Sequence, residues 1–205
     1  MMRILFKQIL ILVVHLVVLQ PLLAQDTLIL MDRKPILVQS FRVEGDEAIY
    51  VKAGQKKERK IEVDKLYSLR SPGKAEQVLY RMDTLENNWY TAAQMADYIR
   101  GQEDARAGYV PQARKTGAGG FLFGFGGSAA GLFYGPLFPI IYTGWKGYTK
   151  PKFTKENGFN EQFNGNPYYT EGFGTTAKRM VNVRSAAGSA SGFILGVVTL
   201  TLVLN

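Results

Sequence analysis

The chain has 205 residues, with 25 basic and 17 acidic side chains, a formal net charge of +8, one histidine and no cysteine. The histidine, His15, lies in the first 24 residues, so a chain cut after residue 24 contains neither histidine nor cysteine. That composition excludes disulfides, thiolate or imidazole zinc sites, and the serine–histidine and cysteine–histidine classes of catalysis. We therefore expect a protein that is not an enzyme and has no catalytic residue, cofactor or metal.

The first 24 residues have the order of a secretory signal: basic Arg3 and Lys7, an apolar run over 9–19, and a small residue, Ala24. The apolar run has about 11 residues, whereas a membrane-spanning helix needs about 20. We therefore expect cleavage after Ala24 and export. The remaining chain keeps 23 basic and 17 acidic residues, a net charge of +6.

Residues 25–83 contain short apolar bursts separated by turn residues, which predicts five or six antiparallel strands in a meander or a small SH3-like barrel. The bursts are 27–31, 36–43, 48–51, 61–63, 66–69 and 78–80. The charged run Lys56–Lys60 is typical of a solvated hairpin turn, and the alternative is a binding patch. The expected class is α+β, with this β-domain outside the cytoplasm.

Residues 84–115 are predicted to hold an amphipathic helix and a linker. Thr91 and Gln94 have the spacing of a capping box, so a helix should begin there. Ala92, Met95, Ala96 and Ile99 share one face, which covers either the sheet or a bilayer surface. Pro111 should interrupt the helix before the next segment.

Two uncharged segments, 116–145 and 185–205, follow, and we predict that they form an antiparallel transmembrane hairpin. The first crossing is expected as a helix over 117–135, with 137–145 as an interfacial exit. The segment between the crossings, 146–184, has seven basic and three acidic residues and many aromatic side chains. Export of residues 25–116 followed by two crossings then places 146–184 in the cytoplasm, on the opposite side from Gln55, and the basic residues of 146–184 agree with the positive-inside tendency.

Glycines recur on one face of both apolar segments, and close backbone packing is what such a stripe predicts in lipid. The expected packing residues are Gly117, Gly120, Gly124, Gly127, Gly131, Gly135, Gly188, Gly192 and Gly196. This glycine zipper serves either packing within one chain or association between copies.

Basic and aromatic residues flank the apolar segments, where headgroup contacts are expected. The predicted interfacial anchors are Tyr109, Arg114, Lys115, Tyr142, Trp145, Phe173, Lys178, Arg179 and Arg184. Two similar octamers, 108–115 and 172–179, precede the two segments, and they reflect either an internal duplication or a composition common at membrane edges.

The signal, the short β-domain, the stretch 95–109 containing Gln102-Glu-Asp-Ala105, the Gly-rich run and the last apolar helix together resemble a loose group of small bacterial exported membrane proteins of unknown function. The resemblance implies this architecture only. From the export signal and the apolar segments we expect a place in the bacterial cell envelope, in the inner membrane, with the N-terminal domain in the periplasm. The sequence favours a non-enzymatic accessory or scaffold subunit, and the alternative is a small oligomeric channel or transport component. The expected partners are the lipid bilayer and either an envelope protein or further copies of the chain, and not nucleic acid.

Overall fold

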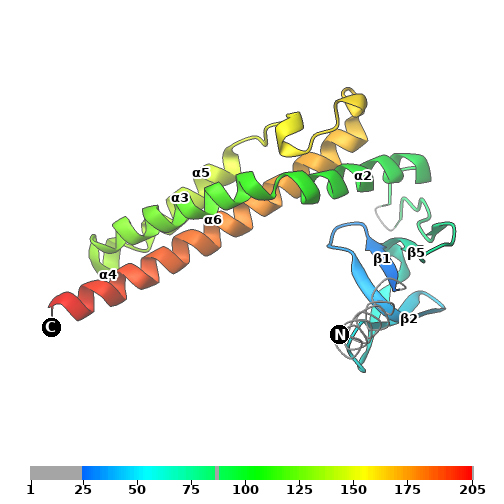
Figure 1. Ribbon diagram of the computed structural model, residues 1–205, viewed down its shortest axis with the longest axis horizontal. Helices are drawn as coiled ribbons and strands as arrows, with labels where there is room; N and C mark the ends of the chain where they lie inside the picture. The colour runs from blue at the N-terminus through cyan, green and yellow to red at the C-terminus, as the bar shows by residue number, and fades with distance from the viewer. Residues whose placement is uncertain (1–24, 86–87, 205) are drawn as a thin grey trace, which may run out of the picture. The chain divides into compact units, whose positions relative to one another are not determined.

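The computed structural model describes residues 25–85 and 88–204, and the chain divides into two compact units after Ala92. The part up to Ala92 is here called the β unit and the part from Ala93 the helical unit (Figure 1). The predicted α+β class is confirmed. The signal sequence and the cut after Ala24 lie outside the described residues.

The β unit is a six-stranded antiparallel sheet in the order β4-β3-β2-β1-β5-β6. The strands are β1 (Asp26–Leu30), β2 (Ile36–Glu44), β3 (Glu47–Lys52), β4 (Glu58–Glu62), β5 (Leu66–Arg70) and β6 (Gln77–Val78), with a 3₁₀ turn, η2, at Val63–Lys65. The predicted antiparallel sheet is therefore confirmed. Strands β1 to β4 form a meander, whereas β5 departs from it by pairing with the other edge of β1.

The sheet buries one compact apolar cluster, which includes Leu28, Val38, Ala48 and Leu66. These residues are 0 to 1% exposed, and they come from four different strands. The short apolar bursts of the sequence therefore contribute to a single core, which stabilises a sheet that has no disulfide.

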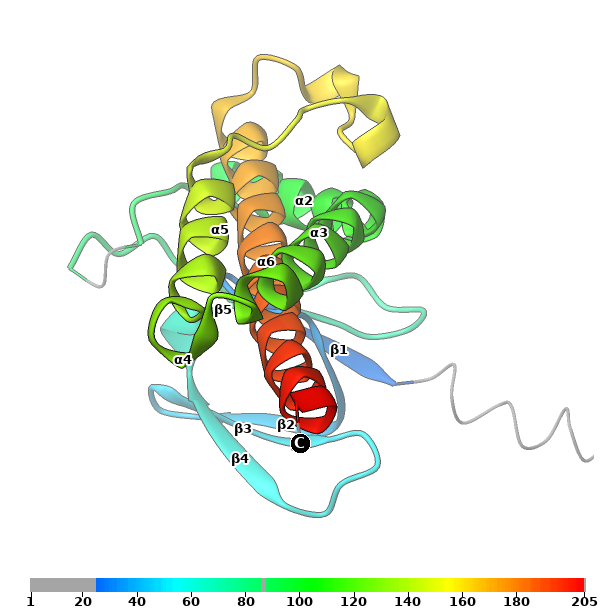
Figure 2. The same ribbon diagram turned by 90° about the vertical axis from the view of Figure 1, so that its left-hand side faces the viewer.

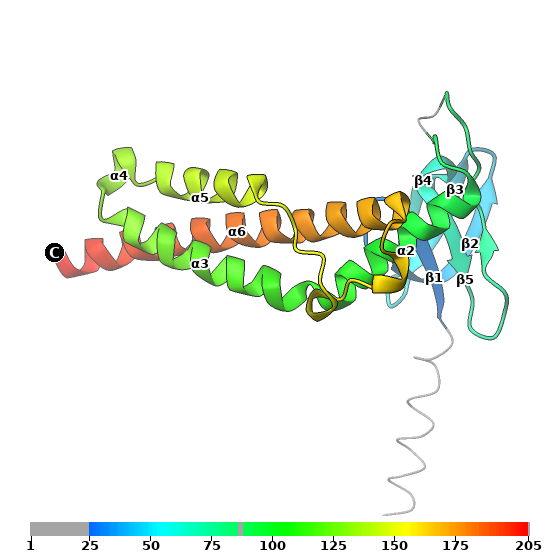
Figure 3. The ribbon, with the colours of Figure 1, turned by 90° about the horizontal axis from the view of Figure 1, so that it is seen from above.

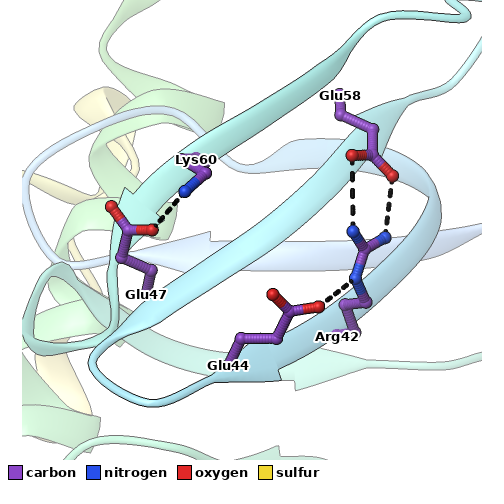
Figure 4. Close-up of polar contacts among 5 residues, drawn as sticks. All are labelled: Arg42, Glu44, Glu47, Glu58 and Lys60. Atoms are coloured by element: carbon purple, nitrogen blue, oxygen red, sulfur yellow. Dashed lines mark hydrogen bonds and ion pairs between the residues drawn. The ribbon is translucent and has the colours of Figure 1, made fainter.

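Strands β2, β3 and β4 carry an exposed ion-pair network (Figure 4). Arg42 donates to both oxygens of Glu58, at 2.8 and 3.3 Å, and its Nε donates to Glu44 at 2.7 Å. Lys60 pairs with Glu47 at 2.6 Å. The hydrogen bonds from Arg42 lower the pKa of the Glu58 carboxyl.

The charged run 56–60 is only partly the turn that the sequence predicts. Lys56 and Lys57 lie in the connection between β3 and β4, but Glu58, Arg59 and Lys60 belong to β4. Strand β4 is the edge of the sheet, and charge on an edge strand opposes pairing with other chains. The edge position explains why a strongly charged segment forms a strand.

The helical unit contains α2 (Ala92–Gly108), α3 (Val110–Ser128), α4 (Gly131–Tyr134), α5 (Leu137–Tyr148) and α6 (Pro167–Leu204), with 3₁₀ turns η3 (Lys155–Asn157) and η4 (Glu161–Phe163). Helix α2 begins directly after Thr91, as the capping-box pattern predicts. Pro111 lies in the first turn of α3, so the predicted interruption is present. The hydrogen bonds Tyr109 N to Ala105 O and Ala113 N to Tyr109 O bridge it, at 2.9 and 3.0 Å.

Helices α3 and α6 lie side by side and run in the same direction, so the predicted antiparallel hairpin is wrong (Figures 1 and 3). Gly120 faces Ser185 and Gly124 faces Ser189, so residue numbers rise together along the two helices. Parallel neighbours need a return path, and α5 supplies it.

The first apolar helix ends at Ser128 and not at Gly135. Gly131 has φ +79°, a left-handed conformation that glycine adopts at little cost and that ends the right-handed helix. The chain reverses there, and the segment expected as an interfacial exit, 137–145, is instead part of α5, which packs back on α3 and α6 (Figure 2).

The connection from Thr149 to Asn166 leads back to α2. Asn166 Nδ2 donates to Asp97 at 2.7 Å, and the Lys152 backbone N–H donates to the Tyr109 hydroxyl at 3.3 Å. The connection therefore lies at the same end of the helical unit as α2. An antiparallel hairpin would have placed it at the opposite end.

Candidate functional site

The glycines predicted to pack come together mainly along the contact between α3 and α6, here called the seam. A β-carbon placed on Gly120 would lie 2.8 Å from the carbonyl oxygen of Ser185. One placed on Gly124 would overlap the carbonyl oxygen of Ser189, and one on Gly192 would overlap that of Phe121. Backbones at this separation leave no room for any side chain, so the seam depends on glycine.

The remaining seam glycines make the same kind of contact within one chain. A β-carbon added to Gly117 would lie 3.2 Å from the carbonyl oxygen of Arg184, and one added to Gly188 would overlap that of Gly117. A β-carbon added to Gly196 would overlap the Ser128 side chain and lie 3.0 Å from the carbonyl oxygen of Phe125. The seam continues into α2, because Gly101 faces Tyr169 O and Gly172 faces Tyr98 O. The contact between α2–α3 and α6 therefore extends over most of their length.

Three glycines of the predicted stripe lie elsewhere. Gly127 faces the Phe138 side chain of α5, and Gly135 faces both Gly131 O and the Phe193 ring. Gly131 faces open space, and its role is the left-handed turn. Because the helix ends at Ser128, the face calculated for a straight helix does not extend to residues 131 and 135.

The half of the helical unit farthest from α2, residues 116–145 and 185–204, is here called the apolar tip. It contains no charged residue, and its surface exposes many large apolar side chains. Phe133 is 94% exposed and Leu202 is 76% exposed. Others are Leu122, Phe123, Phe125, Tyr134, Leu137, Ile140, Ile141, Trp145, Ile194, Leu195, Val198, Leu200 and Val203. A soluble surface rarely exposes so much contiguous apolar area.

By length and composition, one described helix, α6, could cross a membrane, over Pro167–Val203. Only 17% of its most apolar 18-residue window is buried in the helical unit. A core helix of a soluble protein would bury most of that window.

Exposed hydroxyl groups on the apolar part of α6 are hydrogen-bonded to their own helix. Ser191 donates to Gly188 O at 3.0 Å, Thr199 to Leu195 O at 2.8 Å and Thr201 to Val197 O at 2.9 Å. In lipid, polar groups must find partners within the protein because no water is present. These three side chains already meet that requirement.

Basic residues occur on all three helices at the level where the apolar tip begins, and we call Arg114, Lys115, Lys146 and Arg184 the basic collar. Arg184 lies at that level on α6, because its carbonyl faces Gly117. On α5, a β-carbon added to Gly147 would lie 3.5 Å from Asn182 Oδ1. Arg114 and Lys115 are exposed, and Lys146 and Arg184 are half-buried.

Three of the predicted interfacial anchors are core residues instead. Tyr109 and Phe173 are 3% and 0% exposed in one aromatic cluster, and the Tyr142 hydroxyl donates to Thr116 O at 2.9 Å. Folding of the connection onto α2 and of α5 onto α3 buries them. Trp145, Lys178 and Arg179 are exposed, as anchors need to be.

Tyr169 organises the connection, although the sequence pattern did not distinguish it from its aromatic neighbours. It is fully buried, its hydroxyl donates to Asp104 Oδ2 at 2.7 Å, and that hydroxyl accepts from the Asn160 backbone N–H at 3.0 Å. Burial and the bond to Asp104 raise the pKa of Tyr169 to about 12. Phe163 stacks on its ring, with centroids 4.8 Å apart. The aromatic richness of 146–184 was the available signal, but the contact with α2 was not visible in it.

The two octamers do not lie opposite each other. Gly172 lies beside Tyr98, whereas Gly108 lies beside Gly158 in the connection.

Within residues 25–85 and 88–204, no three histidine, cysteine, aspartate or glutamate side chains are grouped so as to hold a metal ion. No protein-family model, curated protein or solved structure matches the chain.

Proposed function

We infer that the chain is a non-enzymatic accessory or scaffold protein of a bacterial envelope, which holds its β unit at a membrane surface by inserting the apolar tip into the bilayer. The observation that carries this proposal is the uncharged tip, whose exposed aromatic and aliphatic side chains are suited to hydrocarbon.

The lengths of the helices fit this mode of insertion. Residues 185–204 of α6 have a length of about 30 Å at 1.5 Å per residue, which equals the hydrocarbon thickness. The stretch of α3 from Thr116 to Ser128 is about 20 Å long, which is shorter than the hydrocarbon thickness. Helices α3 and α5 therefore enter and leave the bilayer on the same side, as a re-entrant hairpin. Among the helices that the structure describes, α6 is the one that crosses.

Several backbone hydrogen bonds support the turn at the end of α3, which lowers the cost of placing it in lipid. Ala130 N donates to Gly127 O at 3.0 Å, and Gly135 N donates to Gly131 O at 2.9 Å. Phe138 N donates to Gly135 O at 3.2 Å.

The channel alternative has less support, because the seam glycines contact other parts of the same chain. A pore lined by these glycines would need the same surfaces for contacts between copies. Ionisable residues that mark ion pathways are also missing from the tip sequence.

The proposal is tested by placing charge on the tip of the full chain. Phe133→Glu with Leu202→Glu should lower the membrane-bound fraction after alkaline carbonate extraction, since a charge in the bilayer interior costs about 3 kcal/mol. Leu37→Glu with Val43→Glu is the matched control, because both residues are exposed apolar side chains of the β unit. A wild-type chain recovered as a soluble monomer, or equal behaviour of the two double variants, would contradict insertion.

A further inference from the structure

Charge is segregated along the helical unit. Ten basic residues and no acidic residue occur in 105–155 and 172–204 taken together. They are Arg106, Arg114, Lys115, Lys146, Lys150, Lys152, Lys155, Lys178, Arg179 and Arg184. The acidic residues of the unit lie in 97–104 and 156–171. The edge of the apolar tip therefore carries positive charge without acidic residues on the same stretch of chain.

The parallel packing of α3 and α6 concentrates this charge at one level. In the antiparallel hairpin expected from the sequence, Arg184 would lie at the opposite end of the helices from Arg114 and Lys115. In the structure, the carbonyl of Arg184 faces Gly117, two residues after Lys115. Lys146 on α5 completes the basic collar.

Like charges also approach one another on the side of the collar away from the tip. Burial lowers the pKa of Arg106, the nearby Glu103 opposes that shift, and the positive charge of Arg179 lowers the pKa further. Arg106 belongs to α2 and Arg179 to α6, so the fold brings two guanidinium groups together. These two residues add positive charge beside the collar.

Trp145 marks the level that the collar would occupy in a bilayer. It is 61% exposed, and the Lys146 ammonium lies 4.8 Å from the centroid of its ring. Exposed tryptophan beside a basic residue is typical of the headgroup region. The hydrocarbon-like surface begins on one side of Trp145 and the charged surface on the other.

We propose that the basic collar binds the phosphodiester groups of anionic phospholipids, so that the protein selects these lipids as its neighbours in the membrane. The proposal rests on insertion of the apolar tip. Each lysine or arginine near an anionic surface increases affinity about fivefold, so four residues at one level are enough for measurable selection.

The test uses Trp145 as the reporter, in the full chain with Trp89→Phe, because the chain has only two tryptophans. The protein is reconstituted in vesicles of mixed phosphatidylcholine and phosphatidylglycerol, with brominated acyl chains on one lipid or on the other. The ratio of the two quenching efficiencies gives the relative association constant of the two lipids. We expect about a fivefold preference for phosphatidylglycerol at low salt, decreasing as salt rises.

The variant Arg114→Gln/Lys115→Gln/Arg184→Gln should lose most of that preference. Lys34→Gln/Lys56→Gln/Lys57→Gln removes the same charge from exposed positions of the β unit and should retain it. Equal quenching by both lipids in the wild-type chain, or an unchanged preference in the collar variant, would overturn the proposal.

Two further results separate this proposal from its foundation. If neither brominated lipid quenches the fluorescence of Trp145, the tip is not inserted and the proposed function is wrong. Quenching by both lipids without preference would leave insertion intact and reject the collar alone. If inorganic phosphate removes the preference and chloride at equal ionic strength does not, the collar binds free phosphate and the assignment to lipid is wrong.

Discussion

The backbone of Gly124 lies directly against the carbonyl oxygen of Ser189, with no space for a side chain between them. This contact lies on the seam, where α3 and α6 are parallel. Gly126, two residues further along α3, faces open space. The two positions therefore give a matched test of the seam.

Gly124→Ala should destabilise the helical unit by about 1–3 kcal/mol, because the added methyl group forces the backbones apart. Gly126→Ala should stabilise it by up to about 1 kcal/mol, because alanine favours helix and meets no neighbour. Thermal unfolding followed by circular dichroism in detergent measures both. Equal effects of the two substitutions would show that the close approach is not important for stability.

The turn between α3 and α4 provides a second pair of glycines. Gly131→Ala should cost about 1–2 kcal/mol, because φ +79° is unfavourable for a residue with a β-carbon. Gly144→Ala in α5, where an added β-carbon meets nothing within 4 Å, should be neutral or stabilising. Resistance to limited proteolysis, compared at one temperature, measures the difference. A tolerated alanine at 131 would argue against the left-handed turn.

Topology gives a third prediction, opposite to that made from the sequence. Because the connection lies at the α2 end of the helical unit, single cysteines at Lys56→Cys and Gln162→Cys should react with an impermeant maleimide from the same side of the membrane. A cysteine added after Asn205 should react from the other side. The native chain has no cysteine, so each label is unambiguous. Labelling of positions 56 and 162 from opposite sides would restore the two-crossing hairpin.

Tyr169 gives a prediction about pH. Its hydroxyl has a pKa of about 12 in the folded chain, above the ordinary value of 10.0. The folded state therefore holds this proton more tightly, and the resulting stabilisation is present below pH 10 and lost as pH rises through about 12.

Tyr169→Phe should lower stability at neutral pH by about 1–3 kcal/mol, because Asp104 loses its hydrogen-bond donor. The variant should also reduce the loss of stability between pH 10 and pH 12. Tyr148→Phe, at a side chain that is 92% exposed, is the control. If the stability of the three proteins depends on pH in the same way, the loss of stability at high pH does not come from Tyr169.

The β unit gives a prediction about Glu58. Arg42→Gln should raise the pKa of the Glu58 carboxyl toward its ordinary value, because the two hydrogen bonds from the guanidinium are lost. In the wild type the lowered pKa gives a stabilisation that is present above the unfolded-state pKa and lost as pH falls through the folded value. Carbon chemical shifts of the Glu58 carboxyl across a titration measure this change, and Lys74→Gln should leave it unaltered.

The sequence predicts well what depends on local pattern. The six apolar bursts correspond to six strands, and the pair Thr91 and Gln94 marks the start of α2, because alternation and capping are properties of neighbouring residues. Spacing of glycines likewise selects Gly120, Gly124, Gly188 and Gly192, which all lie on the seam.

The relative direction of α3 and α6 was the main wrong prediction, because it depends on the turn at Gly131. An uncharged run of 30 residues is long enough for one crossing, and composition alone does not distinguish a single helix from a turn at Gly131. That turn reverses the chain, buries Tyr142 on α3 and makes α3 and α6 parallel. The burial of Tyr109 and Phe173 follows from the same reversal, since it returns the connection to α2.

The parallel seam also sets a minimum length for the connection. The chain must return from Ser128 to the level of Tyr98, a distance of about 45 Å along the helices. Helix α5, with 12 residues, covers about 18 Å of it. Thr149–Asn166 must reach over the remaining distance of about 27 Å, for which about eight extended residues suffice. Deletions of up to about ten residues there should remove the aromatic cluster but leave the seam in register, and longer deletions should pull α6 along α3.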